Sequence, residues 1–144
     1  MASTHVAHDC LVGDNVIMSN LATLGGHVQI GNWAILGGGV LVHQFTQIGE
    51  HSLIGGGFRA VQDVPPFIIA ANHPLEYKGV NIVGLKRRGF SKKDIDSIKK
   101  VYRWFFRSGG NRKTAIEKIE SESPKTKVIQ KILDFIKYSN RGII

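Results

Sequence analysis

Four histidines near the start of the chain are the side chains best suited to chemistry: His5, His8, His27 and His43. An imidazole accepts a proton near neutral pH and also binds metals. Asp9 follows His8 directly, so its carboxylate can hold one ring nitrogen while the other nitrogen takes a proton from an alcohol. Neutral imidazoles are equally good zinc ligands. The histidines alone therefore leave a general base and a metal site open.

A repeat of six residues determines where these side chains lie. Every sixth residue from Val6 to Ala60 is apolar, and two places earlier the side chain is mostly small or branched. This period is the hexapeptide signature of a parallel β-helix, because a helix repeats near 3.6 residues and an isolated strand near two. Glycine follows six of the ten apolar residues, and we expect these glycines at tight corners that need a positive φ.

The repeat also predicts that the histidines converge. Three hexads make one triangular coil, so residues eighteen apart should stack on one face. The first hexad holds His8 and Asp9, the fourth holds His27, and the seventh holds His43 and Gln44. At a coil spacing of ~4.8 Å these groups span about 10 Å along one face. The first histidine of the chain lies just before the first hexad, at the adjoining corner. We predict a site there.

A different kind of sequence follows the hexads. Pro65 and Pro66 cannot continue the strand pairing, so the coils should end there and a loop should follow. The expected fold class is an all-β solenoid plus α. It comprises a parallel β-helix over residues 1–66, a connector over residues 67–90 and a small C-terminal helical domain over residues 91–144.

Apolar residues at helical spacing predict three helices in the last domain. Ser91 is placed to cap the first helix, which Ser108-Gly109-Gly110 should end. A short second helix follows, and Ser123-Pro124 should begin the third as its cap and first turn. The apolar stripes of these helices are interpreted as core.

Charge divides the chain in the same place. Residues 1–64 carry a net charge of −3 and residues 65–144 carry +11, which indicates two modules, the second facing something acidic. A solvated helical surface explains the charge equally well, and nucleic acid, a phosphosugar or an acidic carrier protein would all suit it. No apolar run reaches the ~18 residues of a membrane span, and no secretory signal opens the sequence. A single cysteine fits a cytoplasmic protein.

Five segments resemble one known family over nearly the whole chain. They are HVAHDC (5–10), ATLGGHV (22–28), VHQF (42–45), QDVPPFIIA (62–70) and GVNIVGLKRRGFS (79–91). All five resemble the acyl-ACP:UDP-N-acetylglucosamine O-acyltransferases of lipid A biosynthesis. The last segment is the most specific of them. Known hexapeptide families wind left-handed, so the resemblance implies a left-handed β-helix.

The resemblance implies transfer of an (R)-3-hydroxyacyl group from acyl carrier protein to the 3-hydroxyl of UDP-N-acetylglucosamine, the first step of lipid A synthesis. His8 would be the base, Asp9 its orienting partner and Gly26 the donor of an oxyanion N–H. Positions matching the family's substrate contacts are His5, His27, His43 and Gln44 for sugar and acyl groups, Asn81, Arg87 and Arg88 for the nucleotide, and Gly56 for acyl-chain length. No cofactor or metal is implied, and nucleic acid is not an expected partner. The site would lie between the subunits of a homotrimer, and the basic half would meet the carrier protein.

Two other functions remain open at this point. A zinc hydratase similar to the γ-class carbonic anhydrases would also use histidines on a hexapeptide trimer, but it has no need of the GVNIVGLKRRGFS segment. A trimeric scaffold without activity is the other alternative. Family members carry several more coils before HVAHDC, so we expect the chain to be a fragment of a longer protein or the product of a split gene.

Overall fold

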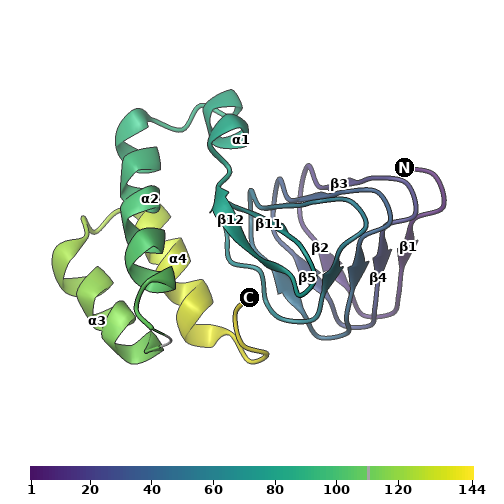
Figure 1. Cartoon of the computed structure of the whole chain (residues 1–144). Helices are drawn as coiled ribbons and strands as arrows, with labels where there is room; N and C mark the ends of the chain where they lie inside the picture. Colours follow the sequence, from purple (N-terminus) through teal and green to yellow (C-terminus); the bar gives the residue numbers. More distant parts are fainter. Residues whose placement is uncertain (110) are drawn as a thin grey trace.

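The computed structural model describes residues 1–109 and 111–144, and it has two parts: a parallel β-helix and a group of helices at one end of it (Figure 1). The coils contain β1 (His5–Val6), β2 (Leu11–Val12), β3 (Ile17–Met18), β4 (Thr23–Leu24), β5 (Gln29–Ile30), β6 (Ile35–Leu36), β7 (Leu41–Val42), β8 (Gln47–Ile48), β9 (Leu53–Ile54) and β10 (Arg59–Ala60). Then follow β11 (Ile68–Ala71), β12 (Glu76–Val80), α1 (Ile82–Arg87), α2 (Lys92–Phe106), α3 (Arg112–Glu122) and α4 (Lys127–Tyr138).

Parallel pairing between coils confirms the predicted repeat. His5 pairs with Thr23 and Val6 with Leu24, so each residue lies beside the one eighteen places on. The strands form three sheets, in the orders β1-β4-β7-β10, β2-β5-β8 and β12-β11-β9-β6-β3. The apolar hexad residues point inward, and those of the middle coils, such as Leu24 and Leu36, are fully buried. Burial of such side chains is the main force that holds the coils together.

Three corners run along the β-helix as edges, and each is named here by one residue. The His8 edge comprises residues 8–9, 26–27 and 44–45, between the first two sheets. The His51 edge comprises residues 14–15, 32–33 and 50–51, between the second and third sheets. The Gly56 edge comprises residues 20–21, 38–39 and 56–57. The three-stranded sheet of β2, β5 and β8 therefore separates the His8 edge from the His51 edge.

The glycines serve a different purpose from the one predicted. Positive φ falls three places after each apolar hexad residue from Val6 to Ile54, and mostly non-glycine residues adopt it there, among them Asp9, His27 and His51. The glycines directly after the apolar residues are needed because the next coil lies too close for a side chain. A Cβ on Gly31 would lie 2.5 Å from the Glu50 nitrogen, and one on Gly49 would lie 2.3 Å from the Pro66 nitrogen.

The expected loop over residues 67–90 is wrong, because this stretch contains β11, β12 and α1. Ile69 pairs with Leu53 in parallel, sixteen residues away, so the last coil is two residues shorter and sheet pairing resumes after the prolines. β12 then returns antiparallel to β11. Asn81 caps α1 by accepting a hydrogen bond from the Gly84 N–H.

The helical domain matches its prediction except at two boundaries. Ser91 caps α2 as expected. The predicted end of this helix includes Gly110, which lies outside the described residues, and α2 itself ends at Phe106. The predicted start of the last helix is wrong, because Ser123 instead ends α3 by donating its N–H to the Ile119 carbonyl. Thr126 caps α4.

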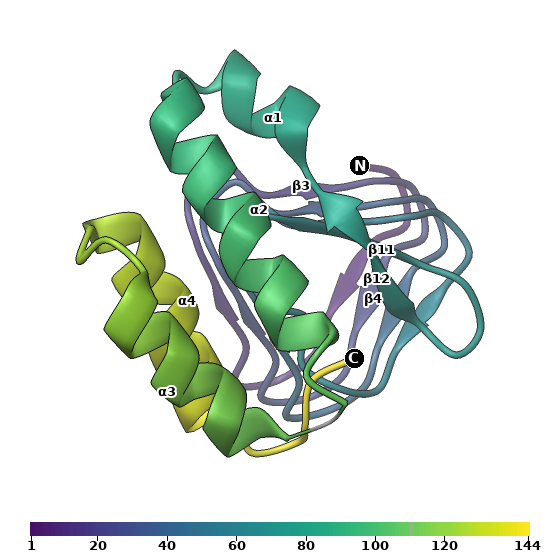
Figure 2. The same ribbon diagram turned by 60° about the vertical axis from the view of Figure 1, so that its left-hand side comes forward.

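Several contacts join the helices to the coils, where α2 lies across the end of the β-helix with α3 and α4 beside it (Figure 2). The buried Tyr102 hydroxyl donates to the Pro66 carbonyl at 2.5 Å, and burial raises the pKa of Tyr102 well above its usual value. The buried Asp63 accepts from the Gln47 N–H and from the Ser139 hydroxyl. Lys131 on α4 lies 3.0 Å from Glu50.

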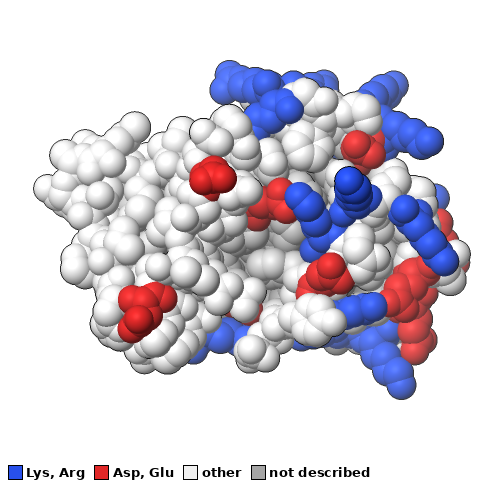
Figure 3. Space-filling model, turned by 180° about the vertical axis from the view of Figure 1, so that it is seen from behind, with Lys and Arg blue, Asp and Glu red and all other residues white. Residues whose placement is uncertain are grey.

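The charge division predicted from the sequence is visible on the surface. Figure 3 shows lysines and arginines over the helical half, while the coils show few charged groups on that face. No helix in the part of the chain that the structure describes is both long and apolar enough to cross a membrane.

Candidate active site

His8 and Asp9 form a hydrogen-bonded pair on the His8 edge. The His8 Nδ1 lies 2.9 Å from the Asp9 Oδ2, and the two side chains are 73% and 66% exposed. His27, eighteen residues after Asp9, lies on the next coil, and its Nε2 is 3.7 Å from the same carboxylate oxygen. The hydrogen bond from His8, with the nearby charge of His27, lowers the pKa of Asp9. Asp9 therefore stays ionised and holds the His8 tautomer with its proton on Nδ1, which leaves Nε2 free to accept a proton.

Gly26 lies directly against the His8 ring. A Cβ built on Gly26 would come within 2.8 Å of the His8 Cε1 and Nε2 atoms, so any side chain there would displace the ring. Among the described residues, no group accepts a hydrogen bond from the Gly26 N–H. A free N–H beside the basic nitrogen is the arrangement that stabilises a developing oxyanion.

Phe45 completes this stack, and the sequence reasoning missed it. Its ring lies parallel to the His27 ring with centroids 4.7 Å apart, and the His27 ring meets His8 edge-on at 5.1 Å. Asp9, His27 and Phe45 are eighteen residues apart in turn, and all three have positive φ. The eighteen-residue spacing from His27 is the signal that places Phe45 in this row, whereas its apolar ring gives no chemical reason to expect it at a site.

The structure brings only two of the four histidines into contact. His5 lies on β1, exposed and paired with Thr23. His43 follows β7, and its Nδ1 lies 3.2 Å from the main-chain oxygen of Gln44, whose side chain is exposed. The roles predicted for His5, His43 and Gln44 in holding sugar and acyl groups stay predictions.

A second group of predicted residues gathers on the His51 edge. The Arg88 Nη1 lies 3.3 Å from the His51 Nδ1, and the guanidinium carbon lies 5.3 Å from the centre of the Trp33 ring. Asn81 is buried and donates from Nδ2 to the His51 main-chain oxygen at 3.0 Å. Arg87 is exposed on α1. Trp33 and His51, also eighteen residues apart, were not singled out from the sequence.

These groups lie on different edges of the β-helix. The base candidate and its partners occupy the His8 edge, and the nucleotide candidates occupy the His51 edge beyond the three-stranded sheet. Gly56 lies on the third edge, where a Cβ would be 3.2 Å from the Gly38 oxygen. One chain therefore does not unite the residues that the resemblance assigns to a single site.

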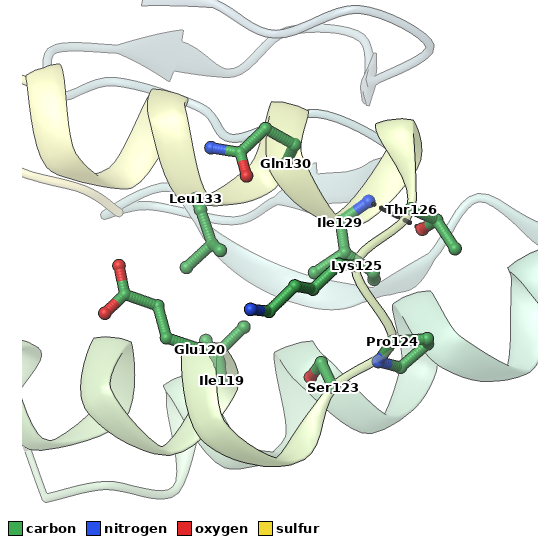
Figure 4. A pocket seen from close by; sticks show the side chains of 9 residues that line it. All are labelled: Ile119, Glu120, Ser123, Pro124, Lys125, Thr126, Ile129, Gln130 and Leu133. Atoms are coloured by element: carbon green, nitrogen blue, oxygen red, sulfur yellow. Dashed lines mark hydrogen bonds between the residues drawn. The ribbon is translucent and has the colours of Figure 1, made fainter.

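The helical domain contains a hollow of about 370 Å³ between α3 and α4, which Figure 4 shows from close by. Ile119, Ile129 and Leu133 form its apolar wall, with polar side chains such as Glu120 and Gln130 beside them. None of the predicted site residues lines this hollow.

Metal binding is possible at one place among the described residues. His8, Asp9 and His27 each offer a ligand atom, and these atoms lie within 4.8 Å of one another. The set has two imidazoles and one carboxylate, a mixture that zinc accepts. All three residues are exposed. The geometry thus leaves the alternative of a metal centre open.

A β-helix of six-residue repeats, with a histidine–aspartate pair on one edge and a helical cap, defines the class of hexapeptide-repeat proteins. The family model described as Udp N-acetylglucosamine O-acyltransferase, domain 2, matches residues 63–144. The chain belongs to this family.

Individual relatives agree with the family model. The acyl-[acyl-carrier-protein]–UDP-N-acetylglucosamine O-acyltransferase of Aliivibrio salmonicida is 47% identical over 142 residues, which are 99% of this chain and 54% of that protein. The crystal structure of a UDP-N-acetylglucosamine acyltransferase from Bacteroides fragilis superposes with a TM-score of 0.96 at 44% identity, over 99% of this chain and 56% of that one. The enzyme from Francisella novicida gives a TM-score of 0.95 at 37% identity, over 100% of this chain and 53% of that one. The chain thus spans about half the length of the curated relatives it matches.

Proposed function

We propose that this chain carries the catalytic base of an enzyme that transfers an (R)-3-hydroxyacyl group from acyl carrier protein to the 3-hydroxyl of UDP-N-acetylglucosamine. The observation that carries the proposal is the His8–Asp9 pair, whose ring lies against Gly26, in a chain of this family. A base beside a free main-chain N–H suits attack of an alcohol on a thioester.

The proposed reaction begins when the His8 Nε2 takes the proton of the sugar 3-hydroxyl. The oxygen attacks the thioester carbonyl, and the Gly26 N–H donates to the oxyanion that forms. The carbon–sulfur bond then breaks, and the carrier thiolate takes the proton back from His8. Asp9 is ionised throughout and stabilises the imidazolium that exists between the two proton transfers.

We assign the nucleotide end to Arg87 and Arg88, because a guanidinium can grip phosphate oxygens with two parallel hydrogen bonds. Asn81 holds α1 in place through its cap and its bond to His51. These groups lie on the His51 edge, so in the proposed homotrimer one subunit supplies the base and a neighbour supplies the arginines. His5, His27, His43 and Gln44 would hold sugar and acyl groups, and Gly56 would limit the acyl chain.

Acyl carrier protein is the proposed protein partner. The helical half carries the positive charge of the chain, and complementary charge speeds the encounter with an acidic protein. The single cysteine, Cys10, packs against the core of the coils, which suits the reducing cytoplasm where this reaction would take place.

An acyl-transfer assay tests the proposal. Hydroxyacyl carrier protein and UDP-N-acetylglucosamine are incubated with the chain in the presence of a chelator, and the acylated sugar nucleotide is measured. We expect product from the wild type and none from His8→Ala. A silent chain is assayed again with upstream coils of a relative restored, and silence there too would refute the acyltransferase.

A zinc hydratase is the second candidate, and the grouping of His8, Asp9 and His27 is the observation that favours it. It would bind about one zinc per site, and its hydration of carbon dioxide would stop when the metal is removed. Metal analysis of the purified protein, with and without chelator, separates the two candidates. A trimer that binds neither UDP-sugar nor carrier protein would instead indicate a scaffold.

A further inference from the structure

We propose that His51 is a positioning residue for nucleotide binding: its neutral imidazole holds one edge of the Arg88 guanidinium, so that the other edge faces the phosphates of UDP-N-acetylglucosamine. This inference rests on the proposed function, and it concerns how Arg88 reaches its working geometry. His51 itself would not touch the substrate.

The contacts of Arg88 fix its orientation on two sides. The guanidinium lies over the Trp33 ring, 5.3 Å from its centre, and its Nη1 meets the His51 Nδ1 at 3.3 Å. A guanidinium has five N–H donors in a planar fork. With Nη1 held by His51, the Nη2 and Nε donors remain as a pair for a phosphate.

The surroundings of His51 keep its ring in place and uncharged. The side chain is 8% exposed, with Phe90 edge-on at 4.9 Å and the Phe67 ring stacked at 5.8 Å. Burial first, and then the positive charges of Arg88 and Lys131, lower the pKa of His51 to about 4. Its Nδ1 therefore accepts from Arg88, while its protonated Nε2 faces Glu50 at 3.7 Å.

His51 also anchors Asn81, which begins the segment that leads to Arg88. Its main-chain oxygen accepts the Asn81 Nδ2 hydrogen bond at 3.0 Å, and Asn81 caps α1. Both ends of the segment from Asn81 to Arg88 are thus attached to His51, one through its backbone and one through its side chain. Substitution of the side chain removes only the second attachment.

The test compares two substitutions in the active form of the enzyme. His51→Phe keeps an aromatic ring but has no acceptor, and it should raise KM for UDP-N-acetylglucosamine about tenfold with kcat nearly unchanged. His51→Asn places an oxygen near the position of Nδ1, and it should stay within about threefold of the wild type. His73→Phe is the matched control, because this exposed histidine packs against Phe58 away from α1.

A second arm repeats His51→Phe in an Arg88→Ala background. We expect no further rise in KM there, because the residue acts through Arg88. An equal rise in both backgrounds, or an unchanged KM in the single variant, would overturn the inference and leave the proposed function standing. Wild-type protein that binds no UDP-N-acetylglucosamine in calorimetry would overturn both.

Discussion

The ring of His8 has little room, because the coil that follows brings Gly26 against it. We predict that Gly26→Ala lowers kcat about a hundredfold by turning the ring away from Asp9, while the fold is kept because the displaced group is an exposed side chain. Gly38→Ala is the control, since this glycine has the same hexad position and its Cβ would meet only the Asn20 oxygen at 3.5 Å. Acyl-transfer rates of both variants test the predicted loss of kcat, and circular dichroism tests whether the fold is kept. A fully active Gly26→Ala would contradict the assigned geometry.

His51 also makes the stability of the protein depend on pH. Its pKa of about 4 lies below the ordinary value of 6.5, so between these values the unfolded chain binds a proton that the native state excludes. The contribution of His51 to the free energy of unfolding is therefore fully present above pH 6.5. It decreases as the pH is lowered, and at pH 5 the free energy of unfolding is smaller by about 2 kcal/mol. Urea unfolding at pH 7 and pH 5 should show this loss, and His51→Phe should reduce it. An equal loss in the variant would assign the effect to other groups.

The sequence predicted which residues lie together where residue type and spacing were informative, and their roles in a site stay predictions. His8, Asp9, His27 and Gly26 follow from residue type and an eighteen-residue step. Phe45, Trp33 and His51 did not, since two are apolar aromatics and the third looks like any other histidine until Arg88 is placed beside it. That neighbour follows directly after α1, 37 residues away in the sequence, so no local pattern shows the contact.

At the scale of elements, two kinds of glycine should respond differently to the same substitution. Gly31→Ala would push a methyl group to within 2.5 Å of the Glu50 nitrogen, and we expect it to cost about 2 to 3 kcal/mol. Gly39→Ala has no atom within 4 Å of the new Cβ, and it should cost about 1 kcal/mol for its positive φ alone. Urea unfolding of both variants measures the difference, and equal costs would refute the close-approach explanation.

Asp63 joins the coils to the end of the chain. Its two carboxylate oxygens accept from the Gln47 N–H and the Ser139 hydroxyl, and its main chain pairs with residues 142–144. We predict that Asp63→Ala lowers the free energy of unfolding by about 1 to 3 kcal/mol, because the Gln47 N–H loses its acceptor. Hydrogen exchange should rise first at residues 142–144. Asp63→Asn keeps one acceptor oxygen and should be milder.

Sequence periodicity predicted the coils and helices well but not the segment between them. Ten strands follow from one repeat, since each hexad reinforces the same register. β11 and β12 have no repeat, and α1 is a helix of six residues that depends on its Asn81 cap and on packing against the His51 edge. Such short elements are stabilised by tertiary contacts, so their own sequence gives a weak signal.

At the scale of the whole molecule, the His8 and His51 edges lie apart, so we predict that each site of the proposed trimer combines His8 of one subunit with Arg88 of a neighbour. Activities are compared at a UDP-N-acetylglucosamine concentration far below KM. There, protein with His8→Ala should be inactive, and protein with Arg88→Ala should have little activity because its binding of the nucleotide is weak. Trimers refolded from an equal mixture should recover about a quarter of wild-type activity, because one interface in four then has both intact residues. Continued inactivity of the mixture, with trimers seen by sedimentation, would place both residues in the site of one subunit.

The regular coil has a consequence for how such a chain can change in length. Each hexad turns the chain through one third of a revolution, so position in the sequence is also an angle around the rod. An insertion or deletion of eighteen residues would alter the length of the rod and leave every later side chain at its original angle. A change of six would rotate all that follows onto the next edge, and Arg87 and Arg88 would leave the angle at which a neighbouring subunit could use them.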